Sequence, residues 1–339
     1  MRVFVTGGNG FIGSVVVRRL VQRGDAVRCL LRARSSTRRI DDVPFERVTG
    51  DVREITSLRE GISGCDAIVH LAGLSAWRDI NSASMPDVVV GGTRNVLQAA
   101  QVAHHPRVVC ISSSVAVNGT SAPVVHIESS PCTLDLAGYI YARAKRDAEA
   151  VCRQAALDGL AVSIVNPCEV YGPYDTGMVT AGNLVDFANS WPALVCGGGT
   201  SVAYVDDVAD GILAALERGR PGERYILGGD NLSIRQLAAM TLDLLGQHKP
   251  ILKLPNPLIR GLAAAGPRLH IPLPFEPAVI PYATLYWFMD NRKAREELGV
   301  HFRPAQDVLR PTLKWLAESG HIASSVDGSQ AGDRVASRK

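Results

Sequence analysis

Several features that would place this protein in a special class are missing. The 339-residue chain has seven cysteines, an odd number without a C-x-x-C pair, so neither a disulfide framework nor a zinc site is expected. Charge of one sign does not dominate either, because 36 basic and 33 acidic residues leave a net charge of +3, which argues against a nucleic-acid partner. No secretory signal precedes the first apolar run. These absences favour a protein of the reducing cytoplasm.

Long hydrophobic runs are also scarce, although 46% of the residues are hydrophobic and could fill a sizeable core. The stretch 255–288 is apolar and rich in proline, but Arg260, Arg268 and His270 interrupt it. It leaves no span long enough to cross a bilayer, so we expect no transmembrane segment. The stretch is interpreted as a packed surface over a ligand pocket, with a membrane-touching patch as the alternative.

What the chain does have is a glycine turn directly after its first apolar run, with Gly7, Gly10 and Gly13 spaced three apart. The first glycine permits a tight turn, the second lets bare backbone approach a phosphate, and the third lets a helix pack close on the strand. The N-terminus of the following helix offers unpaired N–H groups to an anion. The pattern predicts a dinucleotide pyrophosphate site, and an ordinary strand–helix turn is the alternative.

Strand-like apolar runs alternate with helix-period segments through the first half of the chain. This order predicts an α/β fold, a doubly wound parallel sheet of the Rossmann type, with ligand at the carboxyl ends of the strands. The expected strands are 2–6, 26–31, 45–49, 67–71, 107–112 and 161–166, and the expected helices are 10–23, 55–62, 91–103 and 139–157.

Residues 1–166 are therefore expected to form the core of a dinucleotide-binding domain, to which later segments return. The pattern loosens in 167–322, interpreted as a smaller and mainly substrate-binding cap, and the polar tail 323–339 is expected to be disordered. Helices are expected in the cap at 206–218, 233–246, 292–298 and 306–318, with Asp206 and Ser233 as N-caps.

Two groups of residues could carry chemistry. Tyr141 and Lys145 stand four apart in a helical segment, so they share a face, and a nearby cation favours phenolate over phenol. The strand 107–112 runs into Ser112, Ser113 and Ser114, where a hydroxyl could hold a substrate oxygen. Such serines are equally often turn-formers, and the Tyr-x-x-x-Lys pair alone is weak evidence.

Taken together, the glycine turn, the serines and Tyr-x-x-x-Lys resemble the extended short-chain dehydrogenase/reductase family. Further matching motifs are Gly50-Asp51-Val52, His70-Leu71-Ala72-Gly73, Gly92 to Leu97, Asn166-Pro167-Cys168 and Tyr204 to Val208. Within this family the chain is most similar to members like dihydroflavonol reductases and hopanoid-associated epimerases. The resemblance implies an enzyme that uses a dinucleotide and a small-molecule substrate, needs no metal, and forms a homodimer through its two central helices.

The resemblance also implies roles for individual residues. Tyr141 would be the general acid/base, Lys145 would lower its pKa and bind the nicotinamide ribose, and Ser114 would hold the reacting oxygen, with Ser113 as the alternative serine. His70 is expected to be a buried structural residue. Substrate contacts are expected from Ser113, Glu169 and Asn183. The cofactor would be bound by Gly7, Gly10, Phe11, Ile12, Gly13, Arg32, Asp51, Val52, Leu71, Ala72, Gly73, Ser112, Tyr141, Lys145, Pro167 and Cys168.

The end of the second expected strand bears on the choice of dinucleotide. An acidic residue there would accept the ribose hydroxyls of NAD and repel a 2′-phosphate, whereas this strand ends in Leu31-Arg32. An arginine matches phosphate, so NADP is favoured over NAD. The alternative is that 32–39 is simply a solvated basic loop.

The chain departs from the family in two places. Val89 stands where the central-helix motif usually has asparagine, and 199–203 lacks the arginine that nucleotide-sugar members commonly carry. A nucleotide-sugar substrate is therefore less favoured, and five aromatic residues could line a less polar pocket: Trp77, Trp191, Tyr282, Tyr286 and Trp287.

The leading hypothesis is thus an NADP-dependent oxidoreductase that acts on a secondary alcohol or ketone of moderate polarity. The alternatives are an NAD-dependent sugar epimerase or dehydratase and a non-catalytic dinucleotide sensor.

Overall fold

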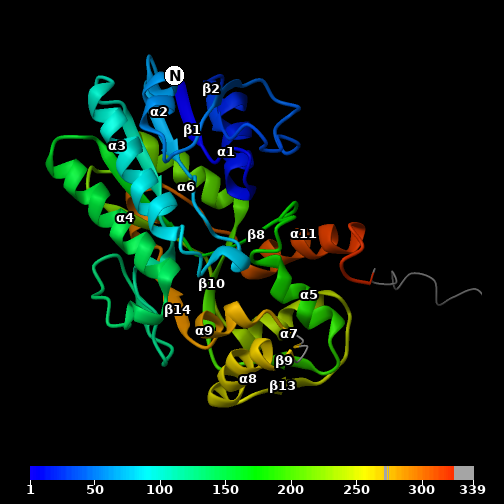
Figure 1. Ribbon diagram of the computed structural model, residues 1–339. Helices are drawn as coiled ribbons and strands as arrows, with labels where there is room; N and C mark the ends of the chain where they lie inside the picture. The colour runs from blue at the N-terminus through cyan, green and yellow to red at the C-terminus, as the bar shows by residue number, and fades with distance from the viewer. Residues whose placement is uncertain (271–272, 274, 324–339) are drawn as a thin grey trace, which may run out of the picture.

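The computed structural model describes residues 1–270, 273 and 275–323. A large sheet flanked by helices forms one part of the molecule, and a smaller part built mainly from the second half of the chain packs against it (Figure 1). The tail expected to be disordered lies, from residue 324 on, outside the described residues.

The large sheet has seven strands in the order β11-β7-β5-β4-β1-β2-β3, and every neighbouring pair is parallel. This confirms the predicted doubly wound fold. The order reverses between β1 and β4, where Thr6 and His70 pair at the carboxyl ends, and such a switch point is where ligands bind. The strands are β1 Arg2–Thr6, β2 Ala26–Leu31, β3 Glu46–Thr49, β4 Ala67–His70, β5 Arg107–Ile111, β7 Val162–Pro167 and β11 Arg224–Leu227.

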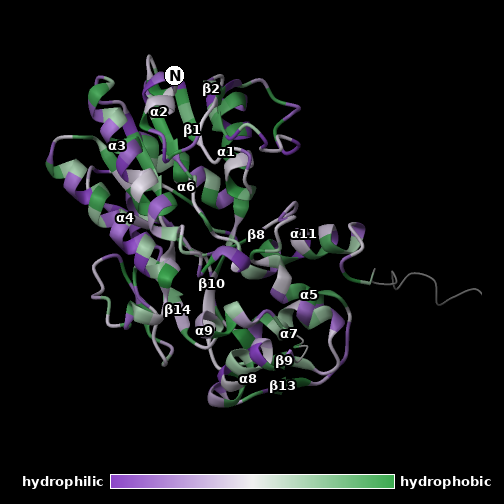
Figure 2. Cartoon of the chain, viewed as in Figure 1, coloured by the Kyte–Doolittle hydropathy of each residue, from purple (hydrophilic) through white to green (hydrophobic). Residues whose placement is uncertain are grey.

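Helices cover both faces of this sheet, and the strands are correspondingly apolar (Figure 2). Alternate residues of β1 show the arrangement, because Val3 and Val5 belong to the core beneath α1 and α6, whereas Phe4 belongs to the core beneath α2, α3 and α4. These helices are α1 Phe11–Gln22, α2 Ile55–Ile62, α3 Gly92–Val102, α4 Ile140–Leu157 and α6 Val205–Arg218.

Among the described residues, the smaller part contains short strands and five α-helices, whereas α10 Arg292–Leu298 packs against α6 and β11 of the larger part. One sheet has the order β12-β10-β14-β6 with β8 beside β10, and β9 pairs with β13. The strands are β6 Val125–His126, β8 Glu169–Tyr171, β9 Ala193–Val195, β10 Gly199–Tyr204, β12 Asn231–Ser233, β13 Ile251–Lys253 and β14 Tyr286–Met289. The helices are α5 Ala181–Asn189, α7 Ile234–Leu244, α8 Asn256–Leu269, α9 Ile280–Ala283 and α11 Ala305–Glu318.

The cap differs from the expectation in several elements. Asp206 is not the N-cap of its helix, because α6 already begins at Val205; its carboxylate instead lies in the first turn, 2.8 Å from Arg19. Ser233 does cap α7, in a reciprocal capping box with Gln236. Helices α5 and α8 and the strands β8, β9, β10, β12, β13 and β14 were not expected from the sequence.

Two further expectations concern cysteine and the membrane. All seven cysteines are free, in line with the expectation of no disulfide framework. Within residues 1–270, 273 and 275–323, we find no helix that combines the length and the apolar character needed to cross a bilayer.

Candidate active site

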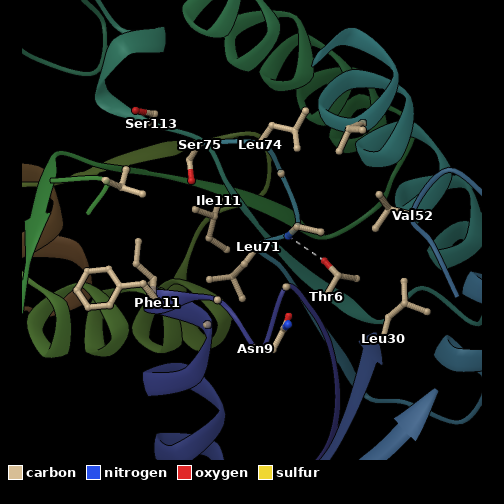
Figure 3. A pocket seen from close by; sticks show the side chains of 18 of the residues that line it. Thr6, Asn9, Phe11, Leu30, Val52, Leu71, Leu74, Ser75, Ile111 and Ser113 are labelled. Atoms are coloured by element: carbon tan, nitrogen blue, oxygen red, sulfur yellow. Dashed lines mark hydrogen bonds between the residues drawn. The ribbon is translucent and has the colours of Figure 1, made fainter. Parts of the chain in front are cut away.

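A cavity of about 480 Å³ opens at the carboxyl ends of the large sheet, over the switch point between β1 and β4. Figure 3 shows side chains around it from β1, β2 and β5, including Thr6, Leu30 and Ile111, and Leu71 from the segment that follows β4. All sixteen residues predicted to bind the cofactor line this one cavity, although they come from seven separate segments of the chain.

The glycine turn forms one wall of this cavity by close backbone contact. Gly7 has a φ of +73°, and a Cβ there would lie 2.8 Å from the Ala72 nitrogen. A Cβ on Gly13 would lie only 2.1 Å from the Gly7 oxygen, so α1 can pack here only without a side chain. Helix α1 has no side-chain cap and no acidic residue in its first turn, which leaves its N–H groups for an anion. The wall fits a dinucleotide pyrophosphate.

His70 is a buried structural residue beside this wall, as expected. The Ala72 N–H donates to Thr6 Oγ1 (Figure 3), which lies 2.7 Å from His70 Nδ1, while His70 Nε2 lies 3.1 Å from Thr93 Oγ1. Thr93 donates its own proton to the Val89 oxygen, so it accepts from Nε2–H, and Thr6 donates to Nδ1. Burial lowers the pKa of His70 to about 3, so the ring is neutral, and both of its nitrogens are already hydrogen-bonded inside the fold, which leaves neither free to take a substrate proton.

Tyr141 and Lys145 share one face of α4, with Lys145 Nζ 5.9 Å from the centre of the Tyr141 ring. Lys145 is buried, donates to the Ile111 oxygen at 2.8 Å, and has its pKa lowered to about 8 by burial. The pKa of Tyr141 is raised to about 12, also by burial, and a hydrogen bond with Ser113 opposes this less strongly. Burial and Ser113 therefore set this shift, and the lowering of the Tyr141 pKa expected from Lys145 stays a prediction.

The serines after β5 divide between two environments. Ser113 contacts Tyr141 and lines the dinucleotide cavity, whereas Ser114 does not line it and instead lies near Cys168. Burial raises the pKa of Cys168 to about 12, so this thiol is not an activated nucleophile. Ser112 also lines the dinucleotide cavity, and its hydroxyl donates at 2.6 Å to Glu149.

Glu149, which the sequence reasoning missed, anchors this strand end from one turn below Lys145. Its carboxylate is 1% exposed and accepts from Ser112 Oγ and from Asn166 Nδ2, each at 2.6 Å. Arg224 and Arg153 contact its second oxygen at 3.0 and 3.2 Å. Asn166 also donates to the Ser113 oxygen at 2.8 Å. The network therefore fixes the backbone that carries the serines relative to α4.

A second cavity, of about 240 Å³, adjoins the first and lies mainly in the smaller part. Its lining is largely apolar and includes Trp77, Tyr282 and Trp287, with Tyr282 stacked on Trp287 at 6.0 Å. Apolar residues of the stretch 255–288 contribute to this lining, as interpreted from the sequence. Six residues line both cavities: Ser75, Ser113, Tyr141, Cys168, Val179 and Thr180. Tyr141 therefore stands where the two compartments meet.

Two of the five aromatic residues expected in a pocket do not line it. Trp191 is 73% exposed after the end of α5, and Tyr286 packs against Phe288 at 5.3 Å. The alternation of β14 explains the second case, because Tyr286 and Phe288 share one face of the strand and Trp287 lies on the other.

The residues predicted to contact substrate gather in the second cavity. Ser113, Ser114, Glu169 and Asn183 all line it. Asn183 Nδ2 donates to Glu169 at 2.7 Å, the Tyr171 hydroxyl donates to the same oxygen at 2.6 Å, and burial raises the pKa of Glu169. The described residues hold no cluster of three or more His, Cys, Asp or Glu side chains suited to a metal ion.

The far end of the dinucleotide cavity is basic. Arg32 follows β2 and lines the cavity, as do Ser35, Arg53 and Asp51. Arg53 binds the Asp51 carboxylate through two nitrogens, each at 2.9 Å, and so holds the pKa of that carboxyl below its usual range. Arg53 and Asn9 were not predicted, although their positions beside Asp51 and inside the glycine turn could have indicated them.

Comparison with known proteins identifies the family. Residues 3–228 match the model of the NAD dependent epimerase/dehydratase family. Sterol demethylase protein B of Methylococcus capsulatus is 31% identical over 335 residues, which cover 95% of this chain and 100% of that protein. A putative dihydroflavonol 4-reductase of Synechocystis is 31% identical over 332 residues, or 94% of this chain and 95% of the other.

A solved structure agrees with this assignment. The nucleoside-diphosphate-sugar epimerase PA4631 of Pseudomonas aeruginosa superimposes with a TM-score of 0.78 at 26% identity, over 95% of this chain and 99% of that one. The shared fold, the glycine turn and the Tyr141–Lys145 pair agree with the family model. The chain therefore belongs to the NAD-dependent epimerase/dehydratase family, within the extended short-chain dehydrogenase/reductases, and is an NAD(P)-dependent enzyme.

Proposed function

We propose that the protein is an NADP-dependent oxidoreductase that interconverts a secondary alcohol and a ketone on a small to medium, moderately apolar substrate. One observation carries the proposal: Tyr141 lines both the dinucleotide cavity and the second, mostly apolar cavity. A substrate oxygen in the second cavity can reach this phenol, while the dinucleotide, when bound in the first, supplies or accepts the hydride.

The residues at the junction would perform the proton chemistry. In the direction of reduction Tyr141 donates its proton to the developing alkoxide, and burial keeps the phenol neutral and able to donate. Lys145 stabilises the phenolate that remains, because its ammonium shares the buried face of α4. Ser114, with Ser113 as the alternative, holds the substrate oxygen. Arg32, Ser35 and Arg53 would face the ribose end of the dinucleotide, and their charge favours a 2′-phosphate, hence NADP over NAD.

The apolar lining supports a substrate with few charged groups. Two relatives are named for such molecules, one for sterols and one for a dihydroflavonol. A second candidate is an NAD-dependent sugar epimerase or dehydratase, which the similarity to the sugar epimerase structure favours. It is the weaker candidate because none of the described residues lining the second cavity is Lys, Arg or His, so no cation there faces a sugar diphosphate.

The test is NADPH and NADH oxidation at 340 nm with a panel of aryl and alicyclic ketones. We expect NADPH-dependent reduction, and a loss of about 10²- to 10⁴-fold in kcat for Tyr141→Phe while NADPH binding persists. Tightly held NAD, with isomerised sugar nucleotide and no net change in absorbance, would instead establish the epimerase.

The same assay with Ser114→Ala and Ser113→Ala assigns the serine, because the variant that lacks the hydroxyl holding the substrate oxygen should lose more activity.

We also propose that the protein is a homodimer through α3 and α4. Light scattering should give twice the 36.2 kDa chain mass, and a monomer would refute it.

A further inference from the structure

The charged side chains that line the second cavity are all acidic. Glu169 and Asp186 are its two acidic residues among those described, and no basic side chain lines it. Arg260 and Lys253 lie near Cys196 of the lining, but neither lines the cavity, and Arg260 donates to Thr284 Oγ1 at 2.7 Å. A ligand in this cavity therefore meets negative charge without a compensating cation.

Glu169 is held in a fixed position as an acceptor. The Tyr171 hydroxyl and Asn183 Nδ2 donate to it at 2.6 and 2.7 Å, and Thr200 also hydrogen-bonds it. Donors of this kind stabilise a carboxylate, and here they oppose the burial that raises the pKa of Glu169. The charge is thus built into the wall rather than carried on a mobile surface side chain.

Asp186, on α5, adds a second carboxyl group to the lining, although the residue as a whole is exposed to solvent. Burial raises its pKa to about 6, and the charge of Glu276 acts in the same direction. An anion entering the cavity would lose hydration beside Glu169 with no cation in the lining to replace it, which is unfavourable, and the solvent-exposed Asp186 would add a weaker, screened repulsion.

Resting on the proposed oxidoreductase function, we propose that the second cavity selects uncharged ketones and rejects those that carry a carboxylate or phosphate, with Glu169 as the main selecting residue and Asp186 as the second. A neutral substrate fits the apolar walls, and a hydroxyl on it can donate to Glu169. Acidic oxoacids and nucleotide diphosphates are excluded by the same charges.

The experiment compares 4-oxo-4-phenylbutanoate with its methyl ester, two ketones that differ by one negative charge. In the NADPH-loaded wild type we expect kcat/KM for the ester to exceed that for the acid by 30-fold or more. In Glu169→Gln this ratio should fall at least 10-fold, and in Asp186→Asn to a smaller extent. Glu60→Gln, at an exposed position on α2, is the matched control and should keep the wild-type ratio.

Each outcome decides the proposal. Equal kcat/KM for acid and ester in the wild type, or a ratio unchanged in both variants, would overturn it while leaving the oxidoreductase function intact. Reduction of no ketone at all, charged or neutral, would overturn the proposed function itself. Circular dichroism checks that Glu169→Gln folds, and Asp186→Asn gives an independent measure if it does not.

Discussion

The glycine turn allows stability and cofactor binding to be separated by two single substitutions. A Cβ on Gly13 would lie 2.1 Å from the Gly7 oxygen, and since real contacts of this kind are 3.0 Å or longer, strand and helix would have to separate by about 0.9 Å. Backbone cannot rotate out of the way as a side chain does. Gly13→Ala should therefore destabilise the fold by about 3 kcal/mol, at the upper end of the cost of overpacking.

Gly10→Ala should behave differently. Its Cβ would lie 3.2 Å from the Gly7 oxygen and near no other described atom, and its φ of −75° suits alanine, so the cost in folding is small. The new methyl group would instead occupy the face that a phosphate approaches. Losing one charge-assisted hydrogen bond costs about 2 kcal/mol, so the Kd for NADPH should rise about 30-fold.

Urea denaturation followed by circular dichroism measures the first effect, and calorimetric titration with NADPH measures the second. Gly261→Ala is the control, because it lies in α8 with no atom within 4 Å of the added Cβ. It should gain up to about 1 kcal/mol from helix propensity and bind NADPH normally. A wild-type unfolding midpoint for Gly13→Ala, or wild-type NADPH affinity for Gly10→Ala, would contradict this account of the turn.

Three further predictions follow from the buried charges and the ribose end. Glu149→Gln should lose about 3 kcal/mol in urea denaturation, because its two arginines and two other donors lose a buried anion, whereas Glu60→Gln should not differ from wild type. In the fold the pKa of His70 is lowered to about 3, so its contribution to the free energy of unfolding is complete above pH 6.5 and is lost as the pH falls toward 3. The part of this contribution that is lost by pH 5 is about 2 kcal/mol. Comparing urea midpoints at pH 7.5 and 5 should show this loss in wild type and a smaller one in His70→Gln; equal losses would refute it. Arg32→Ser should raise the KM for NADPH about 10-fold and leave that for NADH unchanged, and an equal effect on both would argue against 2′-phosphate recognition.

The first half of the fold could be predicted from the sequence because its elements are long and regular. Gly7, Gly10 and Gly13 mark the first turn, and the ends of the main helices fell within two residues of the structure. The cap could not be predicted in the same way. Strands such as β8 and β12 have three residues, too few to show alternation, and α8 contains Gly261, Gly266 and Pro267, which oppose helix.

In the candidate site, too, residue spacing predicted some features, whereas others depend on how the folded chain packs. Spacing placed Tyr141 and Lys145 on one face, but it carries no information about burial, which raises the pKa of Tyr141. Glu149 gave no signal, because a carboxylate on a helix is ordinarily solvated, and only the fold brings Arg224 to it from 75 residues away.

The six residues that line both cavities separate the dinucleotide cavity from the second cavity, and this has a practical consequence for ligand discovery. A small molecule seated on the apolar side rests partly against whatever fills the other side, so part of its binding surface belongs to the dinucleotide. A screen against the protein without dinucleotide would therefore test a binding site that lacks part of its surface. Compound libraries are therefore best tested on the NADPH-saturated protein. Linking a ligand of the second cavity to one of the dinucleotide cavity is a route to inhibitors that occupy both.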